Sequence, residues 1–433
     1  MERIIELATK RGCEAAEVYF SSVVRTPVEY EFGRLKQIQT VENSVIALRV
    51  IKDGKLGFAT STKQEDYETL VENAVATAQF GTKIEFSFAA PAALPKVNCY
   101  DRAVADLTLE RMVATGNEMV EAIRSYEPKI NAMAQVNKAV AEVRALTSLG
   151  FDANCRASEY ALMAGGELVE GDNFLMCYDF EEAANLTADA RRLVASVLDK
   201  FRRARVNRPI ASGKFPVILT PLGLEQCLGP LVASINGSAV EKGFSPWKDK
   251  IGEAVAASDI SIYDDGTYDW STATAPFDAE GTPRRRTPII ENGILRNFLL
   301  DRRTAHALKR APTGNAVRGG DTPPTIAPTT LVMAPGNAEL AAMIKGIDEG
   351  VIIDQLMGAW AGNPYSGQIN GNIALGYKIE RGEITGRVKD CMFSINLFDV
   401  LQRQIAAVSA ERQYRGAVLP WVLIDGAGIS TKS

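Results

Sequence analysis

The stretch that decides the fold runs Lys214-Phe215-Pro216-Val217-Ile218-Leu219-Thr220-Pro221-Leu222-Gly223-Leu224-Glu225-Gln226-Cys227-Leu228-Gly229-Pro230-Leu231-Val232. Residues 217–220 form a short apolar run with strand character, and Pro221 ends it. The leucines that follow recur at helical spacing, which predicts a helix with Leu224, Leu228 and Leu231 or Val232 on one side. This strand and helix join a charged helix to a C-terminal half that is rich in glycine turns.

Upstream of this stretch, residues 1–88 predict an α/β domain. A short amphipathic helix comes first and ends at Gly12, a typical C-cap glycine. A second helix is expected from about Gln64 to Phe80. Strand-like segments lie between the two helices, at residues 16–22, 28–32, 44–51 and 56–60, and a turn at Asp53-Gly54 joins the last two.

A linker of small residues and prolines at residues 89–95 separates this domain from a middle α+β domain at residues 100–208. The middle domain is expected to hold a helix that contains Met112 and Ile123, and then strands near residues 130–136, 139–146 and 159–164. A helix at 187–205 follows. Cations suit the C-terminal end of a helix dipole, and this helix ends with Lys200, Arg202, Arg203 and Arg205.

From residue 209 to 433 glycine turns multiply, which indicates a strand-rich domain. Asn292-Gly293 and Arg381-Gly382 lie between apolar runs and predict β-hairpins. Two helices are expected in this domain, at residues 338–346 and 395–407. The predicted fold class is therefore α+β: an N-terminal α/β domain, an α+β middle domain and a strand-rich C-terminal domain.

Composition narrows the range of functions. A net charge of −5 argues against a dedicated nucleic-acid binder, and the short cluster Arg284-Arg285-Arg286 is assigned to a hairpin surface. No signal-peptide core and no run of about 18 apolar residues is found, so no membrane partner is expected. The cysteines are scattered without a CxxC pair, as in reduced cytoplasmic proteins: Cys13, Cys99, Cys155, Cys177, Cys227 and Cys391. We expect a cytoplasmic protein.

Several segments, in order and spacing, resemble one known family. The N-terminal ones are Ala15-Ala16-Glu17-Val18-Tyr19-Phe20, Gly33-Arg34-Leu35-Lys36-Gln37 and residues 50–59. The C-terminal ones are Asp278-Ala279-Glu280-Gly281-Thr282-Pro283, Ile290-Glu291-Asn292-Gly293-Ile294-Leu295 and Pro312-Thr313-Gly314-Asn315-Ala316. Together they resemble the TldD/PmbA family, also described as modulators of DNA gyrase. The resemblance spans nearly the whole chain and implies a C-terminal domain of TldD/PmbA type.

Catalytic members of that family carry a histidine-glutamate-xxx-histidine zinc motif after the central strand and a cysteine ligand near the C-terminus. The resemblance places Pro221, Leu222 and Gln226 at the three motif positions. A shifted match that keeps Glu225 as the acid puts Leu224 and Gly229 at the histidine positions. The chain has one histidine, His306, and no cysteine after Cys391. This pattern is that of the PmbA (TldE) subunit, which implies no metal ligand and no catalytic residue here, and zinc only in a TldD-type partner.

Other chemistry has weaker support. His306 lies in a short charged helix, and a helix-surface or packing histidine is favoured over a metal ligand or a catalytic base. Cys227 lacks a recognisable histidine partner, so a buried structural thiol is favoured over a nucleophile, and a hydrolase that pairs Cys227 with His306 lacks a third member. Four aspartates could hold a hard cation, but their spacing does not match that of an EF-hand loop: Asp259, Asp264, Asp265 and Asp269.

Two functions therefore compete. In the first, the chain is a non-catalytic subunit that completes the peptide-binding cavity of a TldD-like zinc peptidase acting on unfolded peptides, in a heterodimer. In the second, it is a stand-alone homodimeric binding or regulatory protein, an adaptor linked to DNA gyrase. The sequence leaves open whether the chain has activity of its own. The residues expected to line a peptide cavity are Glu225, Cys227, Thr313, Gly314 and Asn315.

Overall fold

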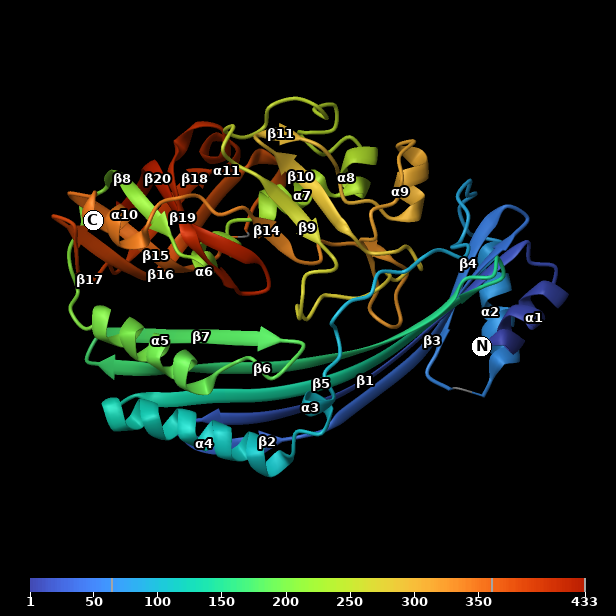
Figure 1. The fold of residues 1–433 in the computed structure, drawn as a ribbon, viewed down its shortest axis with the longest axis horizontal. Helices are drawn as coiled ribbons and strands as arrows, with labels where there is room; N and C mark the ends of the chain where they lie inside the picture. The colour runs from blue at the N-terminus through green and yellow to red at the C-terminus, as the bar shows by residue number, and fades with distance from the viewer. Residues whose placement is uncertain (64, 360, 432–433) are drawn as a thin grey trace.

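The computed structural model describes residues 1–63, 65–359 and 361–431. Figure 1 shows a long, curved sheet along one side of the molecule and a strand-rich C-terminal domain beside it. Helices pack against both parts, so the predicted α+β class is confirmed. Among the described helices, none combines the length and the apolar character that crossing a bilayer requires.

The long sheet is antiparallel, and in the described chain its order is β4-β3-β1-β5-β6-β7, with β2 paired to β1. β1 pairs with β5 from Glu17 opposite Thr147 to Tyr30 opposite Ala134. The segments expected to form a first and a middle domain therefore share one sheet. Its strands are β1 (Ala15–Glu31), β2 (Arg34–Ile38), β3 (Val41–Lys52), β4 (Lys55–Ser61), β5 (Asn131–Thr147), β6 (Asp152–Glu170) and β7 (Asn173–Ala183).

Several predicted strands are parts of longer ones. The segments 16–22 and 28–32 are both β1, because β1 is paired on its two sides, by β3 and by β5, through the residues between them. The segments 130–136 and 139–146 are likewise one strand, β5, between β1 and β6. Pairing on both sides satisfies the backbone N–H and C=O groups and keeps the chain extended where the local pattern weakens.

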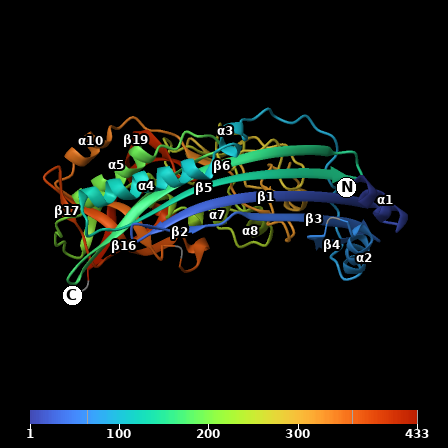
Figure 2. The same ribbon diagram turned by 90° about the horizontal axis from the view of Figure 1, so that it is seen from below.

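Helices cover one face of this sheet. Ala16 and Val18 of β1 pack with the first two helices, whereas Val28 and Tyr30 pack with α4 and α5. Odd-numbered residues of β1 point to the opposite face, because side chains alternate along a strand. Figure 2 shows α1 and α2 at one end of the long strands and α4 and α5 at the other. The helices are α1 (Glu2–Lys10), α2 (Tyr67–Ala78), α3 (Arg102–Ala105), α4 (Leu109–Tyr126) and α5 (Ala190–Arg203).

Side-chain caps fix where two predicted helices begin. The Asp66 carboxylate accepts the N–H of Thr69, and α2 begins at Tyr67. Gln64, the predicted start of that helix, lies outside the described residues. The helix expected at 187–205 is α5, and Asp189 caps it by accepting two backbone N–H groups.

The C-terminal domain contains a barrel. β8, β15, β16, β18 and β20 are each paired to the next, and β20 pairs back to β8, which closes the ring. The strands of this domain are β8 (Gly213–Leu219), β9 (Ile262–Asp265), β10 (Arg286–Glu291), β11 (Ile294–Leu295), β12 (Ala316–Val317), β13 (Thr325–Ile326), β14 (Leu331–Met333), β15 (Glu349–Met357), β16 (Gln368–Glu380), β17 (Glu383–Arg387), β18 (Cys391–Asn396), β19 (Ile405–Tyr414) and β20 (Val418–Thr431).

Both faces of β8 are buried. Val217 and Leu219 belong to the core inside the C-terminal domain, whereas Ile218 packs on the core that holds α4, α5 and the long sheet. A strand buried on two faces is apolar at every position rather than at every second one. The continuous apolar run in the sequence follows from this place in the fold.

Short helices complete the C-terminal domain, and two predictions for it need correction. The helix expected through residues 224–232 is two helices, because Gly229-Pro230 starts a new one. The segment 395–407 is helical only at residues 397–404, because Ile395 and Asn396 belong to β18 and pair with β16, and Ile405 begins β19, which pairs with β20. Both predicted hairpins are confirmed as β10–β11 and β16–β17. The helices are α6 (Pro221–Glu225), α7 (Gly229–Ile235), α8 (Gly237–Glu241), α9 (Arg302–Ala307), α10 (Leu340–Lys345) and α11 (Leu397–Asp399), with single turns at Pro364–Ser366 and Val400–Gln404.

Candidate functional site

Cavities follow the boundary between the long sheet and the barrel, along strand β7. β7 pairs only with β6 in the described chain, so its other edge faces the C-terminal domain (Figure 1). Three cavities of about 720, 250 and 390 Å³ lie along it, which we call the large, central and outer cavities of the β7 seam. From one end of β7 to the other, its residues in these cavities are Phe174, Met176, Tyr178, Asp179, Glu181, Glu182 and Ala183.

The free edge of β7 turns backbone groups into the seam. The carbonyl of Phe174 accepts a hydrogen bond from Arg387 at 2.8 Å. The carbonyl of Tyr178 accepts from Gln355 at 3.0 Å and from Lys200 at 3.1 Å. Even-numbered residues of β7 therefore point their backbone N–H and C=O groups away from β6, because these groups point to alternate sides along an antiparallel strand. Met176 lies between the two and lines the large cavity.

The large cavity has a flexible, apolar lining. Met176, Met357 and Met392 contribute to it from β7, β15 and β18, and Phe174 lies at its β7 end. The side chains of Met357 and Met392 are 58% and 47% exposed. Unbranched thioether side chains adapt to differently shaped apolar groups. This lining can accept varied apolar side chains without selecting one shape.

Three cations and three carboxylates line the central cavity: Lys200, Arg203, Arg415, Asp179, Asp199 and Asp354. Lys200 Nζ lies 2.8 Å from Asp354 Oδ2 and 3.5 Å from Asp179 Oδ2, and Arg415 Nε lies 3.0 Å from Asp179 Oδ1. Burial alone lowers the pKa of Lys200, but attraction to Asp354 and Asp179 outweighs burial and raises it. Lys200, which the sequence assigned to the helix dipole, therefore points inward and forms buried ion pairs.

Helix α6 borders the central cavity at the positions that the resemblance assigns to zinc ligands. Thr220 caps the helix by accepting the N–H of Gly223 at 3.2 Å, and Pro221 occupies the first turn. Leu222 lines the central cavity together with Arg415 from the C-terminal segment. Gln226 lines the large cavity, and its Oε1 accepts the N–H of Leu356 at 2.7 Å. The fold thus brings α6 and the C-terminal Arg415 to one cavity.

These side chains do not fit a zinc ion. Zinc takes imidazole, thiolate and carboxylate donors in a tetrahedral set, whereas Leu222 and Pro221 have no donor atom and Arg415 is a cation. Within residues 1–63, 65–359 and 361–431 no cluster of three or more His, Cys, Asp or Glu is placed to hold a metal. His306 is exposed in the last turn of α9, which is the helix-surface position among the two that the sequence left open.

Gly223 lets α6 lie directly on β15. A Cβ atom added there would lie 2.6 Å from the carbonyl oxygen of Ile353, whereas one added at Gly229 would meet nothing within 4 Å. Gly223→Ala is expected to lower the free energy of unfolding by about 1–3 kcal/mol through overpacking, measured by urea denaturation. Gly229→Ala is the matched control and is expected to be neutral or slightly stabilising. Equal effects of the two substitutions would contradict this account of α6.

The outer cavity combines aromatic walls with the carboxylates of Glu181, Glu182 and Asp269. Glu182 accepts hydrogen bonds from the hydroxyls of Tyr414 and Thr272, both at 3.2 Å. Burial, with a smaller contribution from Glu159, raises the pKa of Glu182. Trp270, in the same cavity, has a φ of 58°, a left-handed conformation that bulky residues rarely adopt. Such backbone strain is common at functional sites.

Of the residues expected to line a peptide cavity, Glu225 is exposed and Cys227 is not. Glu225 ends α6 at a separate concavity of about 590 Å³, shared with Lys242, Phe244 and Tyr365, and desolvation raises its pKa. Cys227 is fully buried in the core, and burial raises its pKa to about 12. Cys227 therefore presents no surface to a ligand in this structure, and the preference for a structural thiol agrees with its position.

The other three expected residues, Thr313, Gly314 and Asn315, are buried in a turn. The Thr313 hydroxyl contacts both the N–H and the carbonyl of Leu300. The amide of Asn315 donates to Asp264 at 2.7 Å. Gly314 has a φ of +83°, and a Cβ there would lie 2.8 Å from the carbonyl oxygen of Pro283. The structure does not bring this turn and Glu225 into one cavity.

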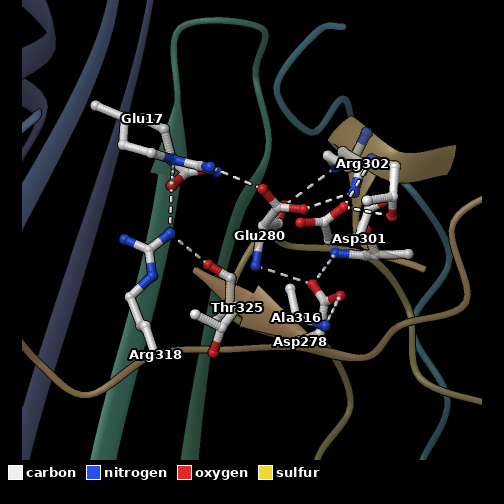
Figure 3. Close-up of polar contacts among 12 residues, drawn as sticks. Glu17, Asp278, Glu280, Asp301, Arg302, Ala316, Arg318 and Thr325 are labelled. Carbon is white, nitrogen blue, oxygen red and sulfur yellow. Dashed lines mark hydrogen bonds and ion pairs between the residues drawn. The ribbon is translucent and has the colours of Figure 1, made fainter. Parts of the chain in front are cut away.

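This turn supports the segment Asp278–Thr282. The Asp278 carboxylate accepts the backbone N–H groups of Glu280, Thr282 and Ala316 (Figure 3). Burial raises the pKa of Asp278 to about 7, and Glu280 adds to the rise. The three N–H groups act in the opposite direction. Asp278 thus fixes the turn that presents Glu280 to the long sheet.

Glu280 belongs to a buried ion network that the sequence did not predict. Arg49 forms two hydrogen bonds to Glu17, at 2.9 and 2.6 Å, and one to Glu280 at 2.7 Å. Arg318 donates to Glu17 at 2.6 Å. Figure 3 shows Glu17, Glu280 and Arg318 turned toward one another between the two parts of the molecule. One signal was available, since Glu17 and Arg49 are charged residues within apolar strand runs.

Arg284, like Lys200, does not lie at the surface position that the sequence predicted. Arg284 was assigned with its two neighbours to a hairpin surface, but it donates to the carbonyl of Ala273 from a largely buried position. Arg285 reaches the carbonyl of Pro312, and Arg286 lies 3.5 Å above the ring of Tyr263. The three arginines therefore point to different partners and do not form one basic patch.

Comparison with known proteins gives consistent matches along the chain. Residues 212–431 match the PmbA/TldA metallopeptidase C-terminal domain, and residues 16–78 match PmbA/TldA metallopeptidase domain 1. An uncharacterized protein of Methanocaldococcus jannaschii is 28% identical over 431 residues, which cover 98% of this chain and 99% of that protein.

Two solved structures have the same fold. One, from Thermotoga maritima MSB8, is described as a candidate modulator of a DNA gyrase; it is 25% identical, with a TM-score of 0.91 and 99% of each chain covered. The other, TldE from Thermococcus kodakarensis, is 22% identical, with a TM-score of 0.92 and 99% of each chain covered.

Proposed function

This chain belongs to the PmbA/TldA metallopeptidase family, and from that premise we propose that it is a non-catalytic, PmbA (TldE)-like subunit of a zinc-dependent peptidase. In this proposal it binds unfolded peptide beside a TldD-type partner in the cytoplasm. The partner carries the zinc ion, which when bound lowers the pKa of a water molecule and polarises the peptide carbonyl. This chain contributes binding surface and no metal ligand.

The observation that supports this proposal is the set of side chains at α6. Pro221, Leu222 and Gln226 stand where the resemblance places the zinc motif, and none of them is an imidazole or a carboxylate. The cavity beside them already contains the ammonium of Lys200 and the guanidinium of Arg415. These cations are paired with Asp179 and Asp354, so the nearest carboxylates already bind protein cations rather than a divalent ion.

The β7 seam is the proposed peptide-binding surface of this subunit. An extended peptide can bond to exposed backbone groups at a strand edge, whatever its sequence, while pockets accept alternate side chains. The backbone of Met176 lies at such an edge, that of β7, and the methionine-lined large cavity lies beside it. Glu225 stays a candidate lining residue, because it is exposed at the concavity next to α6. Both features suit the binding of unfolded chains of varied sequence.

A second candidate function is a stand-alone homodimer that binds or regulates another protein. It is favoured by the relative from Thermotoga maritima that is described as a candidate modulator of a DNA gyrase. The two candidates predict different behaviour of the purified chain. The first requires a TldD-type partner for peptide cleavage, and the second predicts a stable homodimer with no such requirement.

Reconstitution with a TldD-type partner tests the first candidate. The purified chain is expected to bind no stoichiometric zinc and to leave an unfolded peptide uncut, whereas the mixture with a partner that carries the complete zinc motif should cleave it. Zinc is measured by plasma mass spectrometry and cleavage by chromatography of the products. Stoichiometric zinc and cleavage by this chain alone would refute the proposal. Failure to associate with such a partner, together with a homodimer by light scattering, would favour the second candidate.

Variants of the large cavity test where the peptide binds. Met357→Asp and Met392→Asp place charges in the lining, and each is expected to raise the KM of the reconstituted complex for an apolar unfolded peptide several-fold. Leu35→Asp is the matched control, because Leu35 is 46% exposed on β2 and lies outside the seam. Equal KM values for the seam variants and the control would exclude the large cavity as the peptide site.

A further inference from the structure

Cys99 and Cys155 face each other across a short gap. Their sulfur atoms lie 3.7 Å apart, although 56 positions separate the two residues in the sequence. Cys99 belongs to the segment between α2 and α3, and Cys155 to strand β6. We propose that these two thiols are a reversible oxidation site, at which a peroxide converts the pair into a disulfide.

The backbone around Cys99 is fixed to β6. The carbonyl of Cys99 accepts the N–H of Ser158 at 2.9 Å, and the N–H of Asp101 donates to the Ser158 hydroxyl at 2.8 Å. The carbonyl oxygen of Arg156 lies 3.4 Å from each sulfur atom, within reach of either thiol. A disulfide has a sulfur–sulfur bond of about 2 Å. The sulfurs therefore need to approach by less than about 2 Å, which small side-chain rotations can supply.

The pair is also chemically prepared for oxidation. The hydrogen bond from Cys155 lowers the pKa of Cys99 to about 7, and the Arg284 guanidinium lowers it further, while the pKa of Cys155 is raised. A thiolate is the form that reacts with peroxide. The other thiols are less suited, because burial raises the pKa of Cys13, Cys177, Cys227 and Cys391.

The reaction balances with peroxide as the two-electron oxidant. The Cys99 thiolate attacks one oxygen of hydrogen peroxide, the O–O bond breaks, and hydroxide leaves while a sulfenic acid forms. The Cys155 sulfur then attacks the Cys99 sulfur, its proton is released, and the sulfenic oxygen departs as water. Two thiols and one peroxide thus give one disulfide and two waters. A dithiol reductant reverses the change by exchange.

Oxidation at this position would act on the outer cavity. Asn98, next to Cys99, donates to the Asp269 carboxylate at 2.7 Å, and its carbonyl accepts the N–H of Trp270 at 3.2 Å. Asp269 and Trp270 line the outer cavity of the β7 seam. A disulfide would therefore tie the segment that supports this wall to strand β6.

Thiol counting and peptide mapping after peroxide treatment test the proposal. The full chain has six cysteines, and peroxide is expected to reduce the number of reactive thiols in the denatured protein from six to four. Trypsin should then release residues 97–102 linked to residues 145–156, and dithiothreitol should restore all six thiols. Cys13→Ser is the matched control, because Cys13, like Cys155, is partly exposed, and it should still form the link.

Single variants separate a disulfide from other oxidation. Cys99→Ser and Cys155→Ser should each give no linked peptide, and in Cys155→Ser the sulfur of Cys99 should instead gain oxygen by mass spectrometry. If either variant folds poorly, the wild-type peptide map alone decides the question. A wild-type protein that keeps six reactive thiols, or that links a different pair of cysteines, would overturn the proposal.

Discussion

Replacing Arg49 with methionine is expected to lower the free energy of unfolding by about 3–5 kcal/mol, the usual cost of breaking a buried ion pair on one side. Arg49 contacts both Glu17 and Glu280, and all three side chains are at most 3% exposed. Without it, Glu17 keeps only Arg318, and Glu280 has no cation within 4.0 Å among the described residues. The shift of the urea midpoint measures the effect.

An exposed ion pair gives the control for this prediction. Arg102 Nε, at the start of α3, lies 3.1 Å from Oδ2 of Asp106, the residue after the helix, and the two side chains are 84% and 64% exposed. Arg102→Met is expected to cost less than about 1 kcal/mol, because water screens such pairs. The loss of stability in Arg49→Lys should fall between those of the other two variants, since an ammonium keeps the charge but not the bidentate contact with Glu17. A cost for Arg49→Met no larger than that of the control would contradict a stabilising role for the network.

Lys200→Met is expected to destabilise the protein by about 3–5 kcal/mol as well, because it leaves two buried carboxylates with one cation. Asp354 would lose the one cation that lies within 4.0 Å of it among the described residues, whereas Asp179 would keep Arg415. The double variant Lys200→Met with Asp354→Leu removes both charges of this pair. It should recover part of the lost stability, and a double-mutant cycle measures the coupling.

The control for Lys200 is Lys248, which lies 3.8 Å from Asp249 at the surface. Lys248→Met should change the free energy of unfolding by less than about 1 kcal/mol. Additive effects of Lys200→Met and Asp354→Leu would mean that the pair is not coupled. That result would exclude a stabilising role for the ion pair between Lys200 and Asp354.

The predictions that held rest on local signals. The apolar run of β8, the hairpin turns at Asn292-Gly293 and Arg381-Gly382, and the helix at 187–205 are each encoded by neighbouring residues. The ordered motifs indicated the family, and the family models and the structures agree with it. The single histidine is likewise a matter of composition, which no packing can alter.

Strand β7 shows why part of the site was missed. Its odd-numbered residues point to the buried side, and two of them are acids, Asp179 and Glu181. These charges interrupt the alternation of apolar and polar residues that reveals a strand. Their partners are Lys200 and Arg415 for Asp179, and Arg192 for Glu181, and all three lie elsewhere in the chain. The seam therefore could not be predicted from the residues of β7 alone.

By itself the sequence determined the fold class, the family and the side chains at α6, because periodicity, turn residues and motif order are properties of neighbouring positions. Only the tertiary structure decided what those side chains meet. It joined β1 to β5, placed Glu17 and Arg49 against Glu280, and brought Cys99 to Cys155. Contacts between distant positions depend on how whole sheets pack, and no local pattern carries that information.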